Sequence, residues 1–262
     1  MNEVLQLEQS GGLLVLTMDR PDARNALDVA LKEALVVALG RAAADPSVRA
    51  VVLAGSGPAF CVGQDLGELA VRLEADRASA SDTVEQHFNP ITRLLATMPK
   101  PVVAAVHGTC VGAGLGFALA CDLQVWGAGV TLGTAFSGVA LTCDSGLSAS
   151  LARSVGEARA RELVLLGSTF TPEQGVAWGL AGPVVEPEQV GGTARALAER
   201  LAAGPTLAYA ESKRLIAAGS HSSIDEVLAA EAGAQARCGA SDDHLAAVRG
   251  FLAKQRPVLS GR

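Results

Sequence analysis

The stretch from Pro101 to Asp122, PVVAAVHGTCVGAGLGFALACD, constrains the fold more than any other part of the chain. Its apolar run Val102–Val106 predicts a buried strand, and the small residues after Gly112 predict a helix. Gly112, Gly114 and Gly116 lie between them and have no Cβ, so N–H groups at the start of this helix can lie against a ligand atom. The stretch therefore predicts an α/β fold with a turn suited to an oxyanion or a phosphate.

These glycines also have two other interpretations. Glycines at a strand-to-helix turn often only allow the helix to pack closely on the strand. A dinucleotide fingerprint needs G-x-G-x-x-G in the first βαβ unit and an acidic residue roughly 20 positions later. Here the third glycine comes one position early, Phe117 follows it, and the motif lies in the middle of the chain. We therefore exclude a dinucleotide-binding fold.

Composition limits the classes of partner. With 262 residues, 49% of them hydrophobic and only 3% aromatic, the chain predicts a large core built from small side chains. The formal net charge of −6 and the lack of any Lys/Arg-rich run argue against a nucleic-acid partner. The first residues lack a basic segment and an apolar segment, and longer apolar runs are interrupted, so we expect no membrane partner and a cytoplasmic protein.

Cysteine and histidine spacing gives no sign of a metal site. The five cysteines form no C-x-x-C pair, and the four histidines form no H-x-x-x-H pair. We expect neither a disulfide framework nor a bound metal.

The order of predicted elements changes along the chain. A hairpin over 4–18 and strands at 50–54, 102–106 and 123–126 alternate with helices, whereas the chain after Gly156 is almost wholly helical. Asp28 is the predicted N-cap of the first helix, Val29–Ala44. Arg72–Asp82 lacks periodicity and predicts an irregular surface segment. Further helices are predicted at 85–97, 146–153, 157–166, 172–178, 188–203, 205–218, 224–238 and 242–255.

Several motifs in one order resemble the crotonase family, that is, the enoyl-CoA hydratases and isomerases. They are DRPDARNALD, GPAFCVGQDLGEL, PKPVVAAVHGTCVGAGLGFALACDL, LARSVGEARARELVLLG and FLAKQRP, and they cover nearly the whole chain. The resemblance implies a spiral of ββα units over 1–195 with an acyl-CoA site, and a C-terminal helical trimerisation segment over 196–262. It also implies a homotrimer or a dimer of trimers, with a coenzyme A thioester as substrate and no separate cofactor.

The resemblance implies roles for particular residues. The backbone N–H groups of Gln64 and Ala113 would form an oxyanion hole for the thioester oxygen. Phe251 and Lys254 would contact CoA from the same or a neighbouring subunit. The full set of implied CoA and substrate contacts is Arg24, Ala26, Ala59, Cys61, Gly63, Asp65, Leu66, Gly112, Phe136, Leu141, Phe251 and Lys254.

The chain departs from the hydratases of this family at both catalytic glutamates. Gly116 and Phe136 stand at those two positions, and Asp144 is the acid that remains. The Δ3,Δ2-enoyl-CoA isomerases and epoxyphenylacetyl-CoA-type isomerases, which this pattern resembles most, keep an acid at the position of Asp144. Shifting a double bond needs one carboxylate, so we predict an isomerase with Asp144 as the catalytic acid/base. We also expect Phe136, Val139 and Leu141 to form an apolar pocket that raises the pKa of Asp144.

Other functions stay open at this point. Asp144 alternatively caps the following helix, and the protein is alternatively an enoyl-CoA hydratase with atypical residues or a non-catalytic acyl-CoA-binding protein. Aryl-CoA dehalogenases of the family use this aspartate position as nucleophile with a histidine base. Here Asn89 falls near that histidine's position and His87 lies two residues away, so a dehalogenase or thioester hydrolase is a further alternative.

Overall fold

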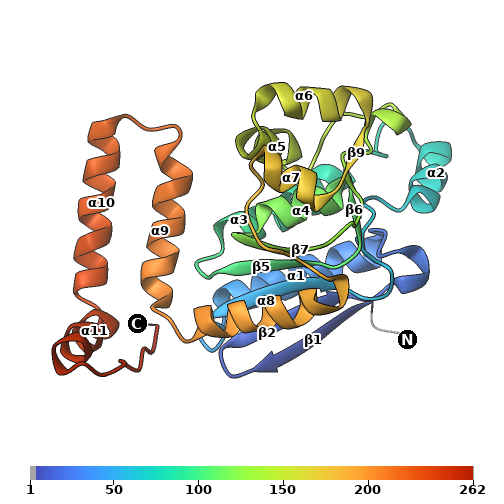
Figure 1. The fold of residues 1–262 in the computed structure, drawn as a ribbon. Helices are drawn as coiled ribbons and strands as arrows, with labels where there is room; N and C mark the ends of the chain where they lie inside the picture. Colours follow the sequence, from blue (N-terminus) through green and yellow to red (C-terminus); the bar gives the residue numbers. More distant parts are fainter. Residues whose placement is uncertain (1–3, 262) are drawn as a thin grey trace.

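A six-stranded sheet forms the centre of the computed structural model, which describes residues 4–261 (Figure 1). The first two strands are antiparallel, and every later neighbour in the sheet is parallel. Parallel strands are buried on both faces, which explains the continuous apolar run at 102–106. In spatial order the strands are β1 (Leu5–Ser10), β2 (Leu13–Met18), β3 (Ala50–Gly55), β5 (Val102–Val106), β7 (Leu123–Gly127) and β10 (Val184–Val185).

A second, four-stranded sheet lies beside the first one. Its strands are β4 (Ala59–Cys61), β6 (Thr109–Val111), β8 (Leu132–Gly133) and β9 (Thr169–Phe170). β4, β6 and β8 each follow a strand of the large sheet and precede a helix: α2 (Leu66–Ala75), α4 (Ala113–Ala120) and α5 (Leu147–Val155). The chain thus repeats a unit of two strands and a helix three times, which is the spiral that the family resemblance implies.

Helices cover both faces of the large sheet. α1 (Val29–Ala44), α3 (Asn89–Thr97) and α4 pack on one face, where they bury Leu53 among other residues. α8 (Pro187–Ala202) covers the other face through Val190, Ala194 and Ala198, which meet Val52 and its neighbours (Figure 1). Successive residues of β3 therefore belong to opposite cores, as the two-residue period of a strand requires. α6 (Glu157–Leu166) and α7 (Pro172–Trp178) complete the core.

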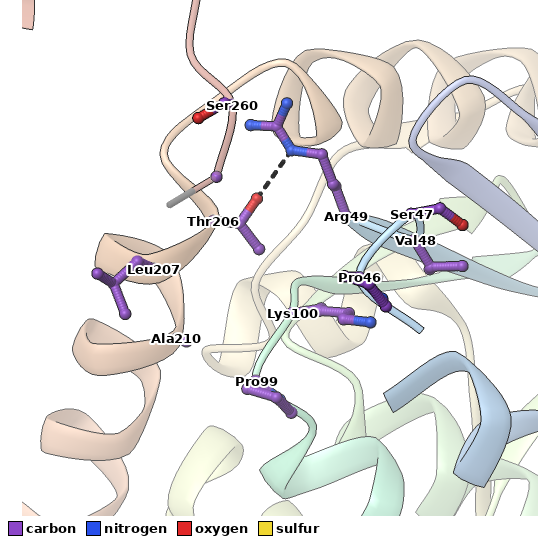
Figure 2. A pocket seen from close by; sticks show the side chains of 11 residues that line it. Pro46, Ser47, Val48, Arg49, Pro99, Lys100, Thr206, Leu207, Ala210 and Ser260 are labelled. Carbon is purple, nitrogen blue, oxygen red and sulfur yellow. Dashed lines mark hydrogen bonds between the residues drawn. The ribbon is translucent and has the colours of Figure 1, made fainter. Parts of the chain in front are cut away.

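Three C-terminal helices form an arm that extends to one side of the core (Figure 1). They are α9 (Thr206–Gly219), α10 (Ile224–Gly239) and α11 (Asp242–Ala253). The Arg49 guanidinium fixes the start of the arm, because it donates to Thr206 Oγ1 at 3.1 Å and to the Leu259 carbonyl at 2.9 Å. Figure 2 shows Arg49 reaching Thr206 across this junction. The Lys213 ammonium of α9 also lies 2.8 Å from the carboxylate of Asp122, the residue before β7.

Most of the predicted elements are confirmed. Asp28 caps α1 by accepting a hydrogen bond from the Leu31 N–H at 2.9 Å, and the predicted helices of the C-terminal half are all present. The prediction for 72–82 is wrong in part, because its first four residues continue α2 and Ala80 is buried. The predicted turn after Val106 also contains the strand β6, a three-residue strand too short to show periodicity.

The predicted boundary between residues 195 and 196 lies inside α8, and the arm begins only at Thr206. Across the described part of the chain, no helix combines the length and the apolar character needed to cross a bilayer.

Candidate active site

A cavity of about 650 Å³ lies where α2, the chain around residues 77–89 and the loop before α5 meet. Apolar side chains such as Leu69, Phe88 and Leu141 make up much of its wall, and Asp144 carries the only carboxylate among the described residues that line it. The lining residues are Gln64, Leu69, Leu73, Arg77, Ala80, Ser81, Thr83, Val84, Phe88, Asn89, Val139, Leu141, Thr142, Cys143, Asp144, Ser145, Gly146 and Ser148.

The backbone of Gln64, which lines this cavity, and of Ala113, at the start of α4, supplies two N–H donors. The Leu27 N–H donates to the Gly63 carbonyl at 2.8 Å, and the Leu27 carbonyl accepts from the Asp65 N–H at 3.3 Å. These two bonds form a β-bridge that does not use the Gln64 N–H. Ala113 is the first residue of α4, where a helix has no partner for its N–H groups. Within residues 4–261, neither N–H donates to another group of the chain. Such preorganised donors can bind an oxygen on which negative charge develops.

Glycines let the two segments that carry these donors come together. Gly63 has a φ of +83°, and a Cβ built on it would lie 3.3 Å from the Ala113 nitrogen. A Cβ on Gly114 would lie only 2.4 Å from the Cys61 carbonyl oxygen. The glycine-dense turn therefore serves close packing and places the donors at the same time.

Asp144 lies in the loop between Ser137–Val139 and α5 and is one of the residues that line the cavity. Burial raises the pKa of this carboxyl, and the Ser145 hydroxyl, which donates to Asp144 Oδ1 at 2.8 Å, partly opposes that shift. The N-cap of α5 is Gly146, with no side-chain cap, so Asp144 does not have the alternative role of a helix cap.

The apolar pocket expected around Asp144 is only partly as predicted. Val139 and Leu141 line the cavity. Phe136 lies in the main core instead, outside the cavity lining. Phe136 directly precedes the short helix Ser137–Val139, and its ring is buried among the core residues.

The position of the first missing glutamate is sterically closed. A Cβ at Gly116 would lie 2.6 Å from the Ser145 Cβ and 2.9 Å from the Ser145 carbonyl oxygen. Real Cβ atoms do not approach other atoms so closely, so a larger residue at 116 would displace Ser145.

Sequence reasoning missed Lys32, whose side chain is fully buried under the cavity. Its ammonium lies 2.9 Å from the Glu68 carboxylate, 2.9 Å from Thr83 Oγ1 and 3.5 Å from Gln64 Oε1. A signal was present, since Lys32 has helical spacing with the buried Leu35 and Leu39.

Residues implied by the family resemblance lie in different environments. Ala59, Cys61, Gly63 and Gly112 are buried near the two donors, and Ala26 is buried beside Leu27. Arg24 is exposed, with a φ of +51°.

Four other implied contacts have different surroundings. The Asp65 carboxylate caps α2 and pairs with Arg20 at 3.0 Å, while Leu66 is exposed outside the cavity lining. Phe251 and Lys254 belong to the end of α11, on the far side of the molecule from α2 (Figure 1).

Asn89, which falls near the position of the dehalogenase histidine, and His87, two residues away, lie in different places. Asn89 lines the cavity. His87 is buried outside the lining, where its Nδ1 lies 3.2 Å from Thr83 Oγ1. Burial is the main cause that lowers the pKa of His87.

A second cavity, of about 450 Å³, lies at the junction of the core and the arm (Figure 2). Its cations are engaged by the protein: Arg49 bonds to Thr206 and Leu259, and Lys100 donates to the carbonyls of Ala42 and Asp45. In residues 4–261, acidic, His and Cys side chains do not gather in a group of three that could bind a metal ion.

Comparison with known proteins gives the family. The model of the enoyl-CoA hydratase/isomerase family matches residues 8–262. The chain is 34% identical to the 1,2-epoxyphenylacetyl-CoA isomerase and 32% identical to the 2,3-dehydroadipyl-CoA hydratase of Escherichia coli K12, with 100% of both chains covered in each case. The solved structure of a candidate enoyl-CoA hydratase/isomerase from Mycobacterium abscessus has a TM-score of 0.95 at 46% identity, covering 98% of this chain and 100% of that one.

These relatives include both isomerases and hydratases, and the structural similarity confirms the predicted crotonase-type α/β fold with its C-terminal helices. The chain therefore belongs to the enoyl-CoA hydratase/isomerase family of acyl-CoA enzymes.

Proposed function

We propose that this protein shifts a double bond, or rearranges a ring, in an acyl-CoA with Asp144 as its single acid/base. The observation that supports this most directly is that Asp144 carries the only carboxylate among the described residues of the cavity wall. The glutamate positions of the hydratases hold Gly116, where Ser145 closes the space, and Phe136, which is in the core.

The chemistry follows from two groups of this chain. The N–H groups of Gln64 and Ala113 bind the thioester oxygen and stabilise the enolate that forms when a proton leaves the acyl chain. The Asp144 carboxylate takes that proton from one carbon and returns it to another, so the double bond moves without addition of water. Hydration would also need an activated water, work that two carboxylates usually share.

The environment of Asp144 suits this exchange. Burial raises the pKa of its carboxyl, which brings the acid and base forms closer in free energy near neutral pH. The apolar wall formed by Leu69, Leu73, Val139 and Leu141 offers space for the acyl group.

Binding of CoA and assembly complete the proposal. Arg24 would supply a cation for CoA, and Phe251 and Lys254 would contact it from a neighbouring subunit, since α11 lies far from α2, whose residues line the cavity (Figure 1). A second copy of this chain is the proposed partner of the arm, in a trimer or a pair of trimers. Several large apolar side chains of the arm and tail are exposed: Ile216, Ile224, Leu228, Phe251, Leu252 and Val258.

Two substrates test the function. The protein is incubated with a 3-enoyl-CoA and with a trans-2-enoyl-CoA, and absorbance of the conjugated thioester is followed. A gain from the 3-enoyl substrate that Asp144→Asn abolishes is expected. Loss of the 2-enoyl signal alone would show a hydratase, and binding without any change would show a carrier. Full isomerase activity in Asp144→Asn would overturn the role of Asp144.

A dehalogenase or thioester hydrolase is less well supported. His87 is not among the residues that line the cavity and lies behind Thr83, which is. The residue near the histidine position that does line the cavity is Asn89, which cannot act as a base. Release of chloride from a 4-chlorobenzoyl-CoA would favour this second function.

A further inference from the structure

Ser145 has an unusual backbone for a residue with a side chain. Its φ is +52°, in the left-handed region, and the following Gly146 has a φ of +69°. A Cβ makes this conformation unfavourable, and glycine would adopt it without strain. Ser145 is also almost completely buried, at 2% exposure. A strained and buried serine directly after Asp144 points to a role for its side chain.

The side chain of Ser145 holds the Asp144 carboxylate. Its hydroxyl donates to Oδ1 at 2.8 Å, and among residues 4–261 no other side chain donates a hydrogen bond to this carboxylate. Oδ2 has no partner in the described chain and is therefore free to accept a proton from a bound acyl group.

The other side of Ser145 lies against the helix that carries an oxyanion donor. Ser145 fills the space beside Gly116, one turn along α4 from Ala113. One residue therefore contacts both the carboxylate of Asp144 and the helix that begins at Ala113. The same contact leaves no room for an acidic side chain at 116.

We propose that Ser145 is a positioning residue, which fixes the Asp144 carboxylate relative to the Ala113 donor and restricts the cavity to proton transfer by one carboxylate. This inference rests on the proposed isomerase function. The contact between Ser145 and Gly116 then determines whether the site can hold one carboxylate or two.

Among the described residues, few charged or titratable groups near Asp144 could change its pKa besides the Ser145 hydroxyl. Cys143 precedes Asp144, and Arg77 lines the same cavity. Burial raises the pKa of the Cys143 thiol, so this group is neutral where the carboxyl titrates. Below the cavity, Lys32 is paired with Glu68. The Ser145 hydroxyl is thus the neighbour whose removal should raise the pKa of Asp144 further.

Ser145→Ala removes the hydroxyl, and Ser145→Gly also removes the Cβ and relieves the strain at positive φ. We expect kcat for the 3-enoyl substrate to fall about tenfold or more in both, with KM little changed, because a hydrogen bond to a charged group is lost. The acid limb of kcat against pH should move to higher pH. Ala135→Gly is the control, since Ala135 also has a positive φ, +61°, and is not among the residues that line the cavity.

A readout without turnover separates this inference from the proposed function. In ¹³C-labelled protein without substrate, the carboxyl signal of Asp144, assigned with Asp144→Asn, should titrate at higher pH in Ser145→Ala than in wild type. An unchanged titration would overturn the inference even if the enzyme isomerises its substrate. Conversely, a shifted titration in a protein that does not isomerise would overturn the proposed function and leave the hydrogen bond established.

The steric half of the proposal has its own test. Gly116→Ala should lower kcat in the wild-type protein, because the new Cβ clashes with Ser145. In a Ser145→Gly protein the same substitution should lower kcat less, because the Cβ of Ser145 is gone and only its carbonyl oxygen still clashes. Additive losses in the double variant would show that the contact between the two residues carries no coupling.

Discussion

The ammonium of Lys32 lies 2.9 Å from the carboxylate of Glu68, and this ion pair joins α1 to α2 beneath the Gln64 donor. Glu68 also accepts a hydrogen bond from the Val29 N–H at 2.6 Å, while Lys32 donates to Thr83. Three segments around the cavity thus meet at one buried cation. A buried charge without a partner raises the free energy of the folded state, so the fold depends on both Lys32 and Glu68.

Lys32→Ala is expected to lower the free energy of unfolding by about 3–5 kcal/mol, because it leaves the Glu68 charge without its partner and creates a cavity. Lys32→Met should cost less, since it fills the same volume. Denaturant unfolding measures both. Arg161→Ala is the control: its pair with Glu157 is exposed, and its loss should cost under about 1 kcal/mol. Equal midpoints for Lys32→Ala and Arg161→Ala would contradict a stabilising role for the buried pair.

Asp144→Asn is expected to lower kcat for isomerisation by about 10²–10⁴-fold, the usual contribution of a positioned acid/base. The amide keeps the shape of the carboxylate and its bond from Ser145, so the affinity for a saturated acyl-CoA should change little. Single-turnover assays and calorimetric titration measure the two quantities. A comparable loss of binding would indicate that Asp144 holds the substrate instead of moving its proton.

The same variant should gain stability at neutral pH. The folded protein holds the proton of Asp144 at higher pH than the unfolded chain, whose carboxyl titrates near 3.8. Stability contributed by the neutral form is present below 3.8 and is lost as pH rises through the raised pKa, at about 1.4 kcal/mol for each pH unit that separates the folded and unfolded pKa values. Thermal unfolding of Asp144→Asn and wild type should therefore differ most at neutral pH and converge in acid. A constant difference at all pH values would show that the raised pKa is not the cause.

Local patterns in the sequence predicted the parts of the fold that depend on near neighbours. The apolar run at 102–106 predicted a central strand, Asp28 marked the start of α1, and the glycines at 112–116 indicated a site for backbone donors. The place of Asp144 came from family motifs, and the structure puts it at the cavity.

Features that depend on tertiary contacts were not visible in the sequence. Gly116 was seen as a missing acid, but only the folded chain shows that Ser145, 29 positions later, closes that space. The helical spacing of Lys32 with Leu35 and Leu39 indicated a core-facing position, but its partners Glu68 and Thr83 are distant in sequence, so the buried ion pair was not predicted. Phe136 was expected in the pocket because it is close to Asp144 in sequence. Sequence distance does not show which way a ring packs, and the ring lies in the core.

The close approach of α4 to β4 gives a last prediction, on Gly114. A Cβ there would lie 2.4 Å from the Cys61 carbonyl oxygen and 2.8 Å from the Cys61 Cβ, both on a buried strand that cannot move freely. Gly114→Ala should therefore push α4 away from β4 and cost about 1–3 kcal/mol of stability. Because Ala113 begins α4, the same shift should separate its N–H from that of Gln64 and lower kcat.

A second helical glycine provides the matched control. Gly191 lies inside α8, is exposed, and a Cβ on it would meet no atom within 4 Å. Gly191→Ala should stabilise the protein by roughly 0.5–1 kcal/mol, since alanine loses less backbone entropy in a helix, and should leave kcat unchanged. Denaturant unfolding and the 3-enoyl-CoA assay compare the two variants directly. If Gly114→Ala behaved like Gly191→Ala in both, then the oxyanion donors would not depend on the contact between α4 and β4.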